Sequence, residues 1–556
     1  MFRKTVVAIT LAVSCLSLQS VPMIHAETEG NTGIRVRAAA EATAAVTAGS
    51  TAAATAANDA SATPAPTEIT DLGGVKLGDV VSVSNGTVKI KYQVTSLTER
   101  TVKVCSGASK TAAVNEKVNK SVVIPEKINC KGYSYSVTAI GAYAFYNCAL
   151  VPDVTFSSEN IKTIGKGAFQ KCKAIKRMVL PAGVTKICAN AFRGCTGIND
   201  LSYSNIAGSK LKTIEKNAFY GCRNITTFGM PEKVASIGNK AFYNCIKLSE
   251  FYSVNLESGT LKTIGESAFA GCSSLARFVV PGSVTSIGSM AFYGCGSMKT
   301  VIFNSSENLT GLGEAAFYKC ASLTSIALPG SLTDVSKGTF YGCSALKKVT
   351  IQTDAKIKSI GEMAFYGCEM LKKFESPKNV TKIRKFAFSG CKKLKTVSLN
   401  SGVTAIAEKA FASCPNLRSI EIPATVTKIN RQAFNGHGKK LIIYGDNNSK
   451  AAKFAKKNKI TFDILSAKDL ESVSLSVNNI NLPVGREYTI KLKYNPSKNV
   501  RAAQKTIKWT SSVSGIVSFV SKANQTLKIK GMRAGSTVIT AKSGNGKTAT
   551  CTVKVS

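Results

Sequence analysis

One frame of about 23 residues recurs along most of the chain, and this repetition constrains the fold more than any other feature. The frame reads V/L-T/K-x-I-G-x-x-A-F-x-x-C-x-x-L-x-x-h-x-h-P, where h is apolar, and neighbouring copies lie 23 to 27 residues apart. A single coil of this length cannot bury its own apolar side chains, whereas stacked coils share one continuous core. We therefore expect an extended solenoid. Its core phenylalanines are Phe145, Phe169, Phe192, Phe219, Phe242, Phe269, Phe292, Phe317, Phe340, Phe365, Phe388, Phe411 and Phe434.

Three segments build each predicted coil. Stretches such as "LARFVV" and "LKKVTI" have strand spacing, and "VTSI" or "LKTI" forms a second short extended piece with its Ile directed inward. "GxxAFxxC" predicts a tight turn into a helical or 3₁₀ turn, with Ala, Phe and Cys on one face. The Gly after Ile suits either a positive φ or a close backbone approach. The predicted fold class is mainly β with short helical or 3₁₀ turns.

The units "VTSIGSMAFYGC" and "LKTIGESAFAGC" resemble the leucine-rich repeats of the BspA-like bacterial surface protein family. The resemblance covers about thirteen units in residues 137–440. Residues 71–136 resemble the family's N-terminal β cap, and residues 441–466 resemble its closing strand, helix and strand. The resemblance implies a leucine-rich-repeat solenoid, a cell-surface location, and a role in adhesion or in binding host proteins.

Residues 471–556 follow a different pattern, in which short alternating strands are separated by Pro, Gly and Asn turns. This segment resembles the group 2 bacterial immunoglobulin-like domains. The only tryptophan, Trp509, is most simply the core residue of a small β-sandwich. The resemblance implies a stalk or a carbohydrate- or protein-binding module.

The N-terminal residues predict export. Arg3 and Lys4 precede an apolar stretch, and a small residue, Ala26, comes before the expected cleavage point, so residues 1–26 are interpreted as a secretory signal peptide. Residues 27–70 are rich in Ala, Thr and Ser and predict a disordered linker. No later apolar run is long enough to predict a transmembrane segment.

Catalytic and metal-binding patterns are weak throughout. The chain has two histidines, His25 in the predicted signal peptide and His437 in the last repeat. His437 has no acidic partner nearby in the sequence. No cysteine pair has the C-x₂-C spacing of a zinc site. "AKSGNGKT" (541–548) satisfies a relaxed phosphate-loop pattern, but the alternating strand after it favours a hairpin turn. We therefore expect no enzyme, cofactor or metal.

The seventeen cysteines pose a question of redox state, because twelve of them occupy one position of the repeat. Export favours disulfides, and stacked coils bring equivalent Cα atoms near bridging distance. A cysteine three residues after the core Phe should nevertheless point inward as a small hydrophobic residue. The interpretation is a column of buried free thiols, with Cys105 and Cys130 in the N-terminal cap as the best candidates for a disulfide.

The net charge of +41 favours polyanionic neighbours, although it is also consistent with solubility alone. If "LxxhxhP" is a strand, its outward positions form a candidate basic stripe suited to a linear polyanion; the alternative is lysines that protect exposed strands from aggregation. Expected partners are a protein, a glycan or an anionic wall polymer of a Gram-positive bacterium, with no specific nucleic acid and a monomeric chain. The stripe comprises Lys176, Arg177, Arg277, Lys299, Lys347, Lys348, Lys372, Lys373, Lys395 and Arg418.

The polar insertions of alternate repeats, 204–210, 255–260 and 304–310, offer a second edge for recognition. Neutral drift of surface loops is the alternative interpretation.

Overall fold

The computed structural model describes residues 71–86, 88–256, 259–304, 307–352, 354–465, 470–496 and 502–556. The predicted signal peptide and linker lie outside these residues. One hydrophobic core runs from Val75 to Ile460, and a second core lies within residues 470–555.

The N-terminal strands form a mainly antiparallel sheet that continues into the solenoid. β1, β2 and β3 are antiparallel neighbours, β3 pairs in parallel with β6, and β5 pairs with β6. From β6 the same sheet extends through the short strands of the first coils up to β20. The cap therefore supplies the first hydrogen-bonding edge on which the coils stack. These strands are β1 (Val80–Asn85), β2 (Val88–Ser96), β3 (Thr101–Val104), β4 (Val122–Ile124), β5 (Lys127–Cys130) and β6 (Tyr133–Ile140).

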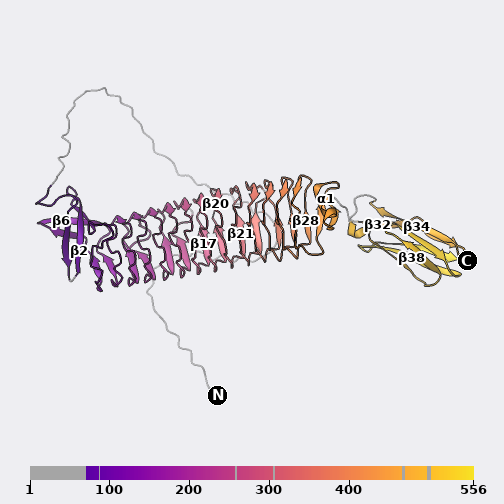
Figure 1. The fold of residues 1–556 in the computed structure, drawn as a ribbon, viewed down its shortest axis with the longest axis horizontal. Coiled ribbons are helices and arrows are strands. Elements are labelled where there is room, and N and C mark those ends of the chain that lie inside the picture. Colours follow the sequence, from indigo (N-terminus) through magenta and orange to yellow (C-terminus); the bar gives the residue numbers. More distant parts are fainter. Residues whose placement is uncertain are drawn as a thin grey trace, which may run out of the picture. The chain divides into compact units, whose positions relative to one another are not determined.

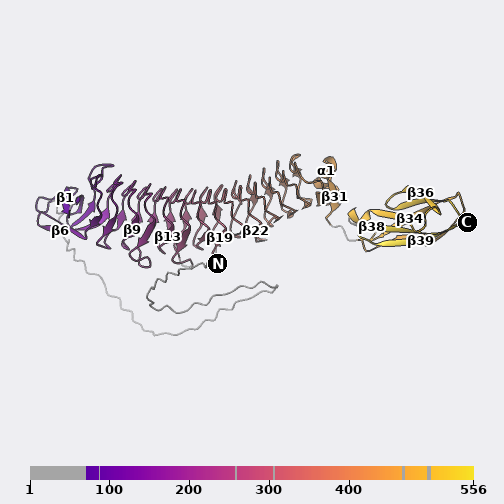
Figure 2. The same ribbon diagram turned by 90° about the horizontal axis from the view of Figure 1, so that it is seen from below.

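Most coils contribute one long and one short strand (Figure 1; Figure 2). The short strands pair in parallel with their equivalents in the next coil except at one break, whereas the long strands pair in parallel only within several separate groups of neighbouring coils. The long strands are β7 (Val154–Phe156), β9 (Arg177–Leu180), β11 (Asp200–Tyr203), β13 (Thr227–Met230), β15 (Glu250–Ser253), β17 (Arg277–Val280), β19 (Thr300–Phe303), β21 (Ser325–Leu328), β22 (Lys348–Ile351), β24 (Lys373–Glu375), β26 (Thr396–Ser398) and β28 (Ser419–Glu421). The short strands are β8 (Thr163–Ile164), β10 (Lys186–Ile187), β12 (Thr213–Ile214), β14 (Ser236–Ile237), β16 (Thr263–Ile264), β18 (Ser286–Ile287), β20 (Gly311–Leu312), β23 (Ser359–Ile360), β25 (Lys382–Ile383), β27 (Ala405–Ile406) and β29 (Lys428–Ile429).

The "GxxAFxxC" segment forms the third side of each coil as a run of turns, and not as a helix. In one coil, Ala168 N–H donates to Gly165 O and Cys172 N–H donates to Phe169 O, both at 3.1 Å. Gly167 and Lys171, each at the third position of its turn, have φ of +60° and +67°, values that a right-handed helix excludes. The expected i→i+3 bonds are present, but the third residue of each turn has a left-handed conformation. The chain therefore follows the side of the coil as successive turns and does not wind into a helix.

These turns also bond from coil to coil. Phe169 N–H donates to Ala191 O at 2.7 Å and Lys171 N–H donates to Arg193 O at 2.9 Å, and the same contacts recur along the solenoid. The third side is therefore a hydrogen-bonded ladder in its own right.

The glycine after the repeat isoleucine is explained by close approach alone. Gly288 and Gly313 do not have positive φ. A Cβ on Gly313 would lie 2.3 Å from Ser289 N, and a Cβ on Gly288 would lie 2.6 Å from Glu266 N. The expectation of close approach is confirmed at these positions, and the alternative of positive φ is wrong.

The core phenylalanines form one column of rings through the solenoid. All thirteen are buried, and each of the twelve neighbouring pairs is stacked, with centroids 5.0–5.7 Å apart and planes within 13°. Long-strand phenylalanines such as Phe278 meet this column edge-on, 4.7 Å from Phe292. The column links every coil to the next through side-chain packing.

The coil between Leu323 and Phe340 interrupts the short-strand sheet and weakens the pairing of its long strand. β19 and β21 pair only at Thr300 and Ser325, whereas β17 and β19 pair at four positions. On the short-strand side, β20 ends the first sheet and the hydroxyl of Ser336 donates to Leu312 O at 2.6 Å. The turn ladder continues unbroken, because Phe317 N–H still donates to Thr339 O at 2.9 Å. The short-strand sheet is thus broken here, while β19, β21 and β22 remain in one sheet and the turn ladder continues.

A strand, a helix and a strand follow the last repeat. β30 (Ile442–Gly445) and β31 (Thr461–Ile464) extend the long-strand sheet on either side of α1 (Lys450–Lys457). The Ser449 hydroxyl caps α1 by accepting from Ala452 N–H at 3.2 Å. The Phe454 ring of α1 meets Phe434 at 5.7 Å and covers the end of the phenylalanine column.

Residues 470–556 form two four-stranded sheets that share one core. Trp509 is buried in this core, and its indole N–H donates to Ala523 O at 2.9 Å. The first sheet contains β32 (Ser472–Leu475), β34 (Glu487–Asn495), β37 (Thr526–Gly531) and β36 (Val517–Lys522), and the second contains β33 (Asn479–Leu482), β39 (Thr548–Val555), β38 (Gly535–Ser543) and β35 (Ile507–Ser511). A 3₁₀ turn, η1 (Ala502–Lys505), precedes β35.

Candidate binding surface

The outward positions of the long strands stack in columns. Residue 177 is in register with residue 200, and residue 373 with residues 396 and 419. Neighbouring strands in a sheet lie about 4.8 Å apart, so equivalent side chains repeat at that spacing. All ten predicted stripe residues are exposed on these columns.

The cations are concentrated towards the C-terminal coils and do not form an uninterrupted stripe. Between Arg177 and Arg277 the column positions hold residues such as Asn199, Thr226 and Ser249, none of them cationic. From β22 to β28, by contrast, four coils in succession place a cation just before or at the start of the strand. We call this the basic face, and define it as Lys347, Lys348, Lys372, Lys373, Lys395 and Arg418.

Backbone hydrogen bonds hold this face in order. Lys395 N–H donates to Lys372 O and Arg418 N–H donates to Lys395 O, both at 2.8 Å. The Lys372 N–H to Lys347 O contact is longer, at 3.5 Å. Because the main chain fixes each Cα, these like charges stay together despite their mutual repulsion.

Most of these cations have no acidic partner within the described part of the chain. Arg177 pairs with Asp200 at 3.3 Å, and Lys373 pairs with Glu375 in its own strand. Lys347, Lys372, Lys395 and Arg418 form no ion pair with any described residue. Their charge is available to a ligand.

A column of surface tyrosines was not anticipated from the sequence. Tyr293, Tyr318, Tyr341 and Tyr366, each directly after a core Phe, stack with centroids 4.5–4.9 Å apart and planes within 11°. The signal was present in the repeated "FY" dipeptides, but its meaning depended on knowing that the turns stack in register.

The repeated cysteines are packing residues with a hydrogen-bonding role. Eleven thiols donate to the carbonyl of the core Phe one coil earlier, at 2.8–3.3 Å. Burial raises the pKa of the Cys343 and Cys414 thiols to about 12, so both thiols are protonated and unreactive at neutral pH. All sixteen described cysteines are free, including Cys105 and Cys130, so the disulfide considered for that pair is not formed in this structure.

No group of three or more metal-ligating side chains occurs among the described residues. His437 Nδ1 lies 2.9 Å from the neighbouring Gly438 carbonyl oxygen. Residues 544–547 form the turn between antiparallel strands β38 and β39, so "AKSGNGKT" is a hairpin. Within the same residues, no helix is long and apolar enough to cross a bilayer.

Two parallel strand columns and a turn ladder, wound around a continuous core, define a leucine-rich repeat solenoid. The BspA type Leucine rich repeat region, with six copies, matches residues 127–249, 201–311, 246–357 and 310–442. These matches together cover more than half of the 556 residues, and the chain belongs to this family.

Several solved structures are similar to this chain. A leucine-rich repeat protein from Bacteroides ovatus is 24% identical over 66% of this chain and 98% of its own, with a TM-score of 0.40. A leucine rich cell surface protein from Faecalibacterium prausnitzii is 23% identical over 68% and 97%, with a TM-score of 0.38. The pneumococcal vaccine antigen PcpA is 20% identical over 71% and 100%, with a TM-score of 0.41. No curated protein has significant sequence similarity to the chain.

Proposed function

We propose that this protein is a secreted or cell-surface binding protein of a Gram-positive bacterium, adhesin-like, which recognises an extended polyanion. The basic face carries the proposal: four successive coils present exposed cations at a repeat of about 4.8 Å. A linear ligand with regularly spaced anionic groups gains one more contact with every coil. Sulfated or sialylated glycans and acidic segments of host proteins have this chemistry.

In this proposal the solenoid is a rigid scaffold without a catalytic role. Residues 471–556, as an immunoglobulin-like module, would serve as a spacer or a wall-binding module. The alternative is a structural role, in which charge alone holds the protein on the anionic polymers of its own cell wall, without a host ligand.

The test compares two sets of lysines in the full chain. Lys347, Lys372 and Lys395 are replaced by Ala on the basic face, and the matched control replaces Lys162, Lys212 and Lys262, which are exposed beside the short strands β8, β12 and β16. Both triple variants lose the same charge, so a difference between them reports position. Retention is measured on immobilised heparin and on immobilised poly(glycerol phosphate), a wall-like polymer, from about 0.1 to 0.5 M NaCl.

We expect the basic-face variant to elute from heparin at clearly lower salt than the control variant. Equal elution of the two variants would contradict a localised site, since net charge would then explain binding. Tighter retention on poly(glycerol phosphate) than on heparin, again dependent on the basic face, would favour the structural alternative.

A further inference from the structure

A pocket of about 570 Å³ lies at the ends of β19, β21 and β22. Phe303 comes from β19, Leu328 from β21, and Gln352 directly follows β22, and β19 and β21 pair at only one position. Its volume lies within the range of about 300–1,000 Å³ that ligand sites usually occupy. Its lining includes Phe303, Glu307, Pro329, Gln352, Asp354 and Lys356.

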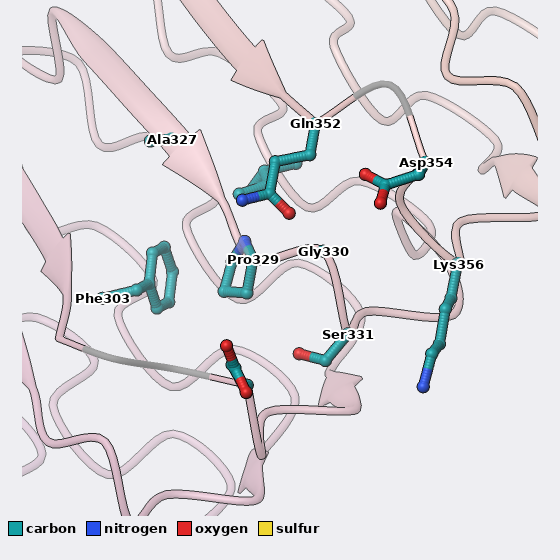
Figure 3. Close-up of a pocket in the computed structure, with 10 residues that line it drawn as sticks. Phe303, Ala327, Pro329, Gly330, Ser331, Gln352, Asp354 and Lys356 are labelled. Atoms are coloured by element: carbon teal, nitrogen blue, oxygen red, sulfur yellow. The ribbon is translucent and has the colours of Figure 1, made fainter. Parts of the chain in front are cut away.

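The lining combines an aromatic ring with side chains that both donate and accept hydrogen bonds. Figure 3 shows the Phe303 ring on one side of Pro329 and the Gln352 amide over Pro329 and Gly330, with Asp354 and Lys356 along the far wall. Gly330 lies against this amide: a Cβ there would lie 2.4 Å from Gln352 Oε1, so the amide would have to shift.

The same local design occurs a second time near the first coils. "FSSENI" (156–161) and "FNSSENL" (303–309) are nearly the same sequence, and each is followed one coil later by Leu-Pro at a strand end. The first copy forms a smaller pocket of about 260 Å³ that includes Phe156, Glu159, Pro181 and Ser204. A Phe, a Glu and a Pro thus line a pocket at both places, which a chance gap between loops does not explain.

In the first copy the polar groups are already engaged. Glu159 Oε2 accepts from Ala182 N–H at 2.5 Å, and Ser204 Oγ accepts from the same N–H at 2.9 Å. At the second copy the pocket is about twice as large. We therefore place the ligand at the second copy.

We propose that this pocket binds an uncharged sugar residue of a glycan, a function beyond the polyanion binding proposed above. An aromatic ring can pack against the C–H face of a pyranose, and carboxylate, amide and ammonium groups together satisfy neighbouring hydroxyls as acceptors and donors. The carboxylates of Glu307 and Asp354 disfavour an anionic ligand at this point. This local acidity contrasts with the +41 charge of the chain.

The experiment measures binding of the full chain to immobilised neutral oligosaccharides that end in glucose, galactose, mannose, N-acetylglucosamine, N-acetylgalactosamine or fucose. The buffer contains about 0.5 M NaCl, so that screening suppresses the basic face. We expect saturable binding to at least one glycan, weakened at least tenfold by Phe303→Ala and by Glu307→Gln. The variant Glu159→Gln, at the smaller copy, is the matched control and should leave the affinity unchanged.

Two control measurements separate pocket binding from binding by the basic face and from a folding defect. Lys372→Ala on the basic face should leave neutral-glycan binding unchanged, so the two proposals can fail independently. Unfolding midpoints of the variants within a few degrees of the parent protein exclude a folding defect. Binding to no glycan of the panel, equal binding by the parent and both pocket variants, or binding only through Lys372 would overturn the proposal.

Discussion

Eleven of the twelve repeated cysteines sit beside a core Phe carbonyl that already accepts one backbone hydrogen bond. Phe317 O accepts from Cys320 N–H at 3.2 Å within its own turn and from the Cys343 thiol of the next coil at 3.1 Å. A thiol is small and only weakly polar, so it fills the space beside the Phe ring and uses the second lone pair of the carbonyl. The residue links two coils without any redox chemistry.

The protonated thiols predict alkaline sensitivity. Burial raises the pKa of Cys343 from 9.0 to about 12. The stabilisation from this shift is complete below pH 9 and is lost as the pH rises towards 12, because the unfolded chain releases the proton first. The free energy of unfolding should therefore fall with rising pH in this window, by up to about 1.4 kcal/mol per pH unit and thiol.

The measurement is the thermal unfolding midpoint between pH 7 and 11, for the parent protein and for Cys343→Ala. The variant should start from a lower midpoint and lose less of it above pH 9. Identical slopes for the two proteins would show that this thiol does not carry the effect.

At the scale of the elements, the turns on the third side of the solenoid connect each coil to its neighbours by both backbone and side-chain contacts. Phe292 N–H donates to Ala316 O at 2.8 Å, and its ring stacks on Phe269 and Phe317 at 5.3 and 5.2 Å. The same residue thus contributes to the backbone ladder and to the aromatic column. This explains how a side without strands stays in register.

Phe292→Ala should cost about 3–5 kcal/mol, the usual effect of removing a fully buried aromatic ring. Because coils contact only their neighbours, the damage should be local, with faster amide hydrogen exchange in the flanking turns. Tyr293→Ala, next in sequence and 38% exposed, is the control and should cost about 0.5–1.5 kcal/mol. Equal effects of the two substitutions would contradict a dominant inner column.

On the scale of the whole molecule, a solenoid must protect both ends of its core. At the N-terminal end β6 provides a paired edge, and at the C-terminal end β31 and α1 close the last coil. The α1 helix has basic residues in its last turn, Lys456 and Lys457, where they interact favourably with the helix dipole. Its apolar face, Ala451, Phe454 and Ala455, packs inward.

Phe454→Ala should therefore loosen the C-terminal end first. We expect faster hydrogen exchange in β30, β31 and the turn around Phe434, with coils before β24 unaffected. Lys453→Ala, exposed on the same helix, should change none of these rates. A uniform increase along the solenoid would contradict the role of α1 as an end cap.

The sequence by itself determined the repeat, its inward residues and the leucine-rich repeat class. A periodic pattern of Ile, Phe, Cys and Leu can bury its apolar side chains in only one way, by stacking. The assignment of residues 471–556 to a bacterial immunoglobulin-like domain remains a prediction, although Trp509 lies in a core shared by two sheets.

Only the tertiary structure decided how the coils meet. The left-handed position two residues after the core Phe is mostly glycine, as at Gly194, Gly294 and Gly342. The left-handed position two residues before the Phe holds residues as different as Asn190, Ser267 and Met290, because the inter-coil ladder imposes its conformation. The short-strand sheet breaks where Ser336 takes a position often held by glycine and Thr339 one held by alanine. Whether such substitutions merely shift a coil or break a sheet depends on contacts between neighbouring coils, and those contacts exist only in the stacked fold.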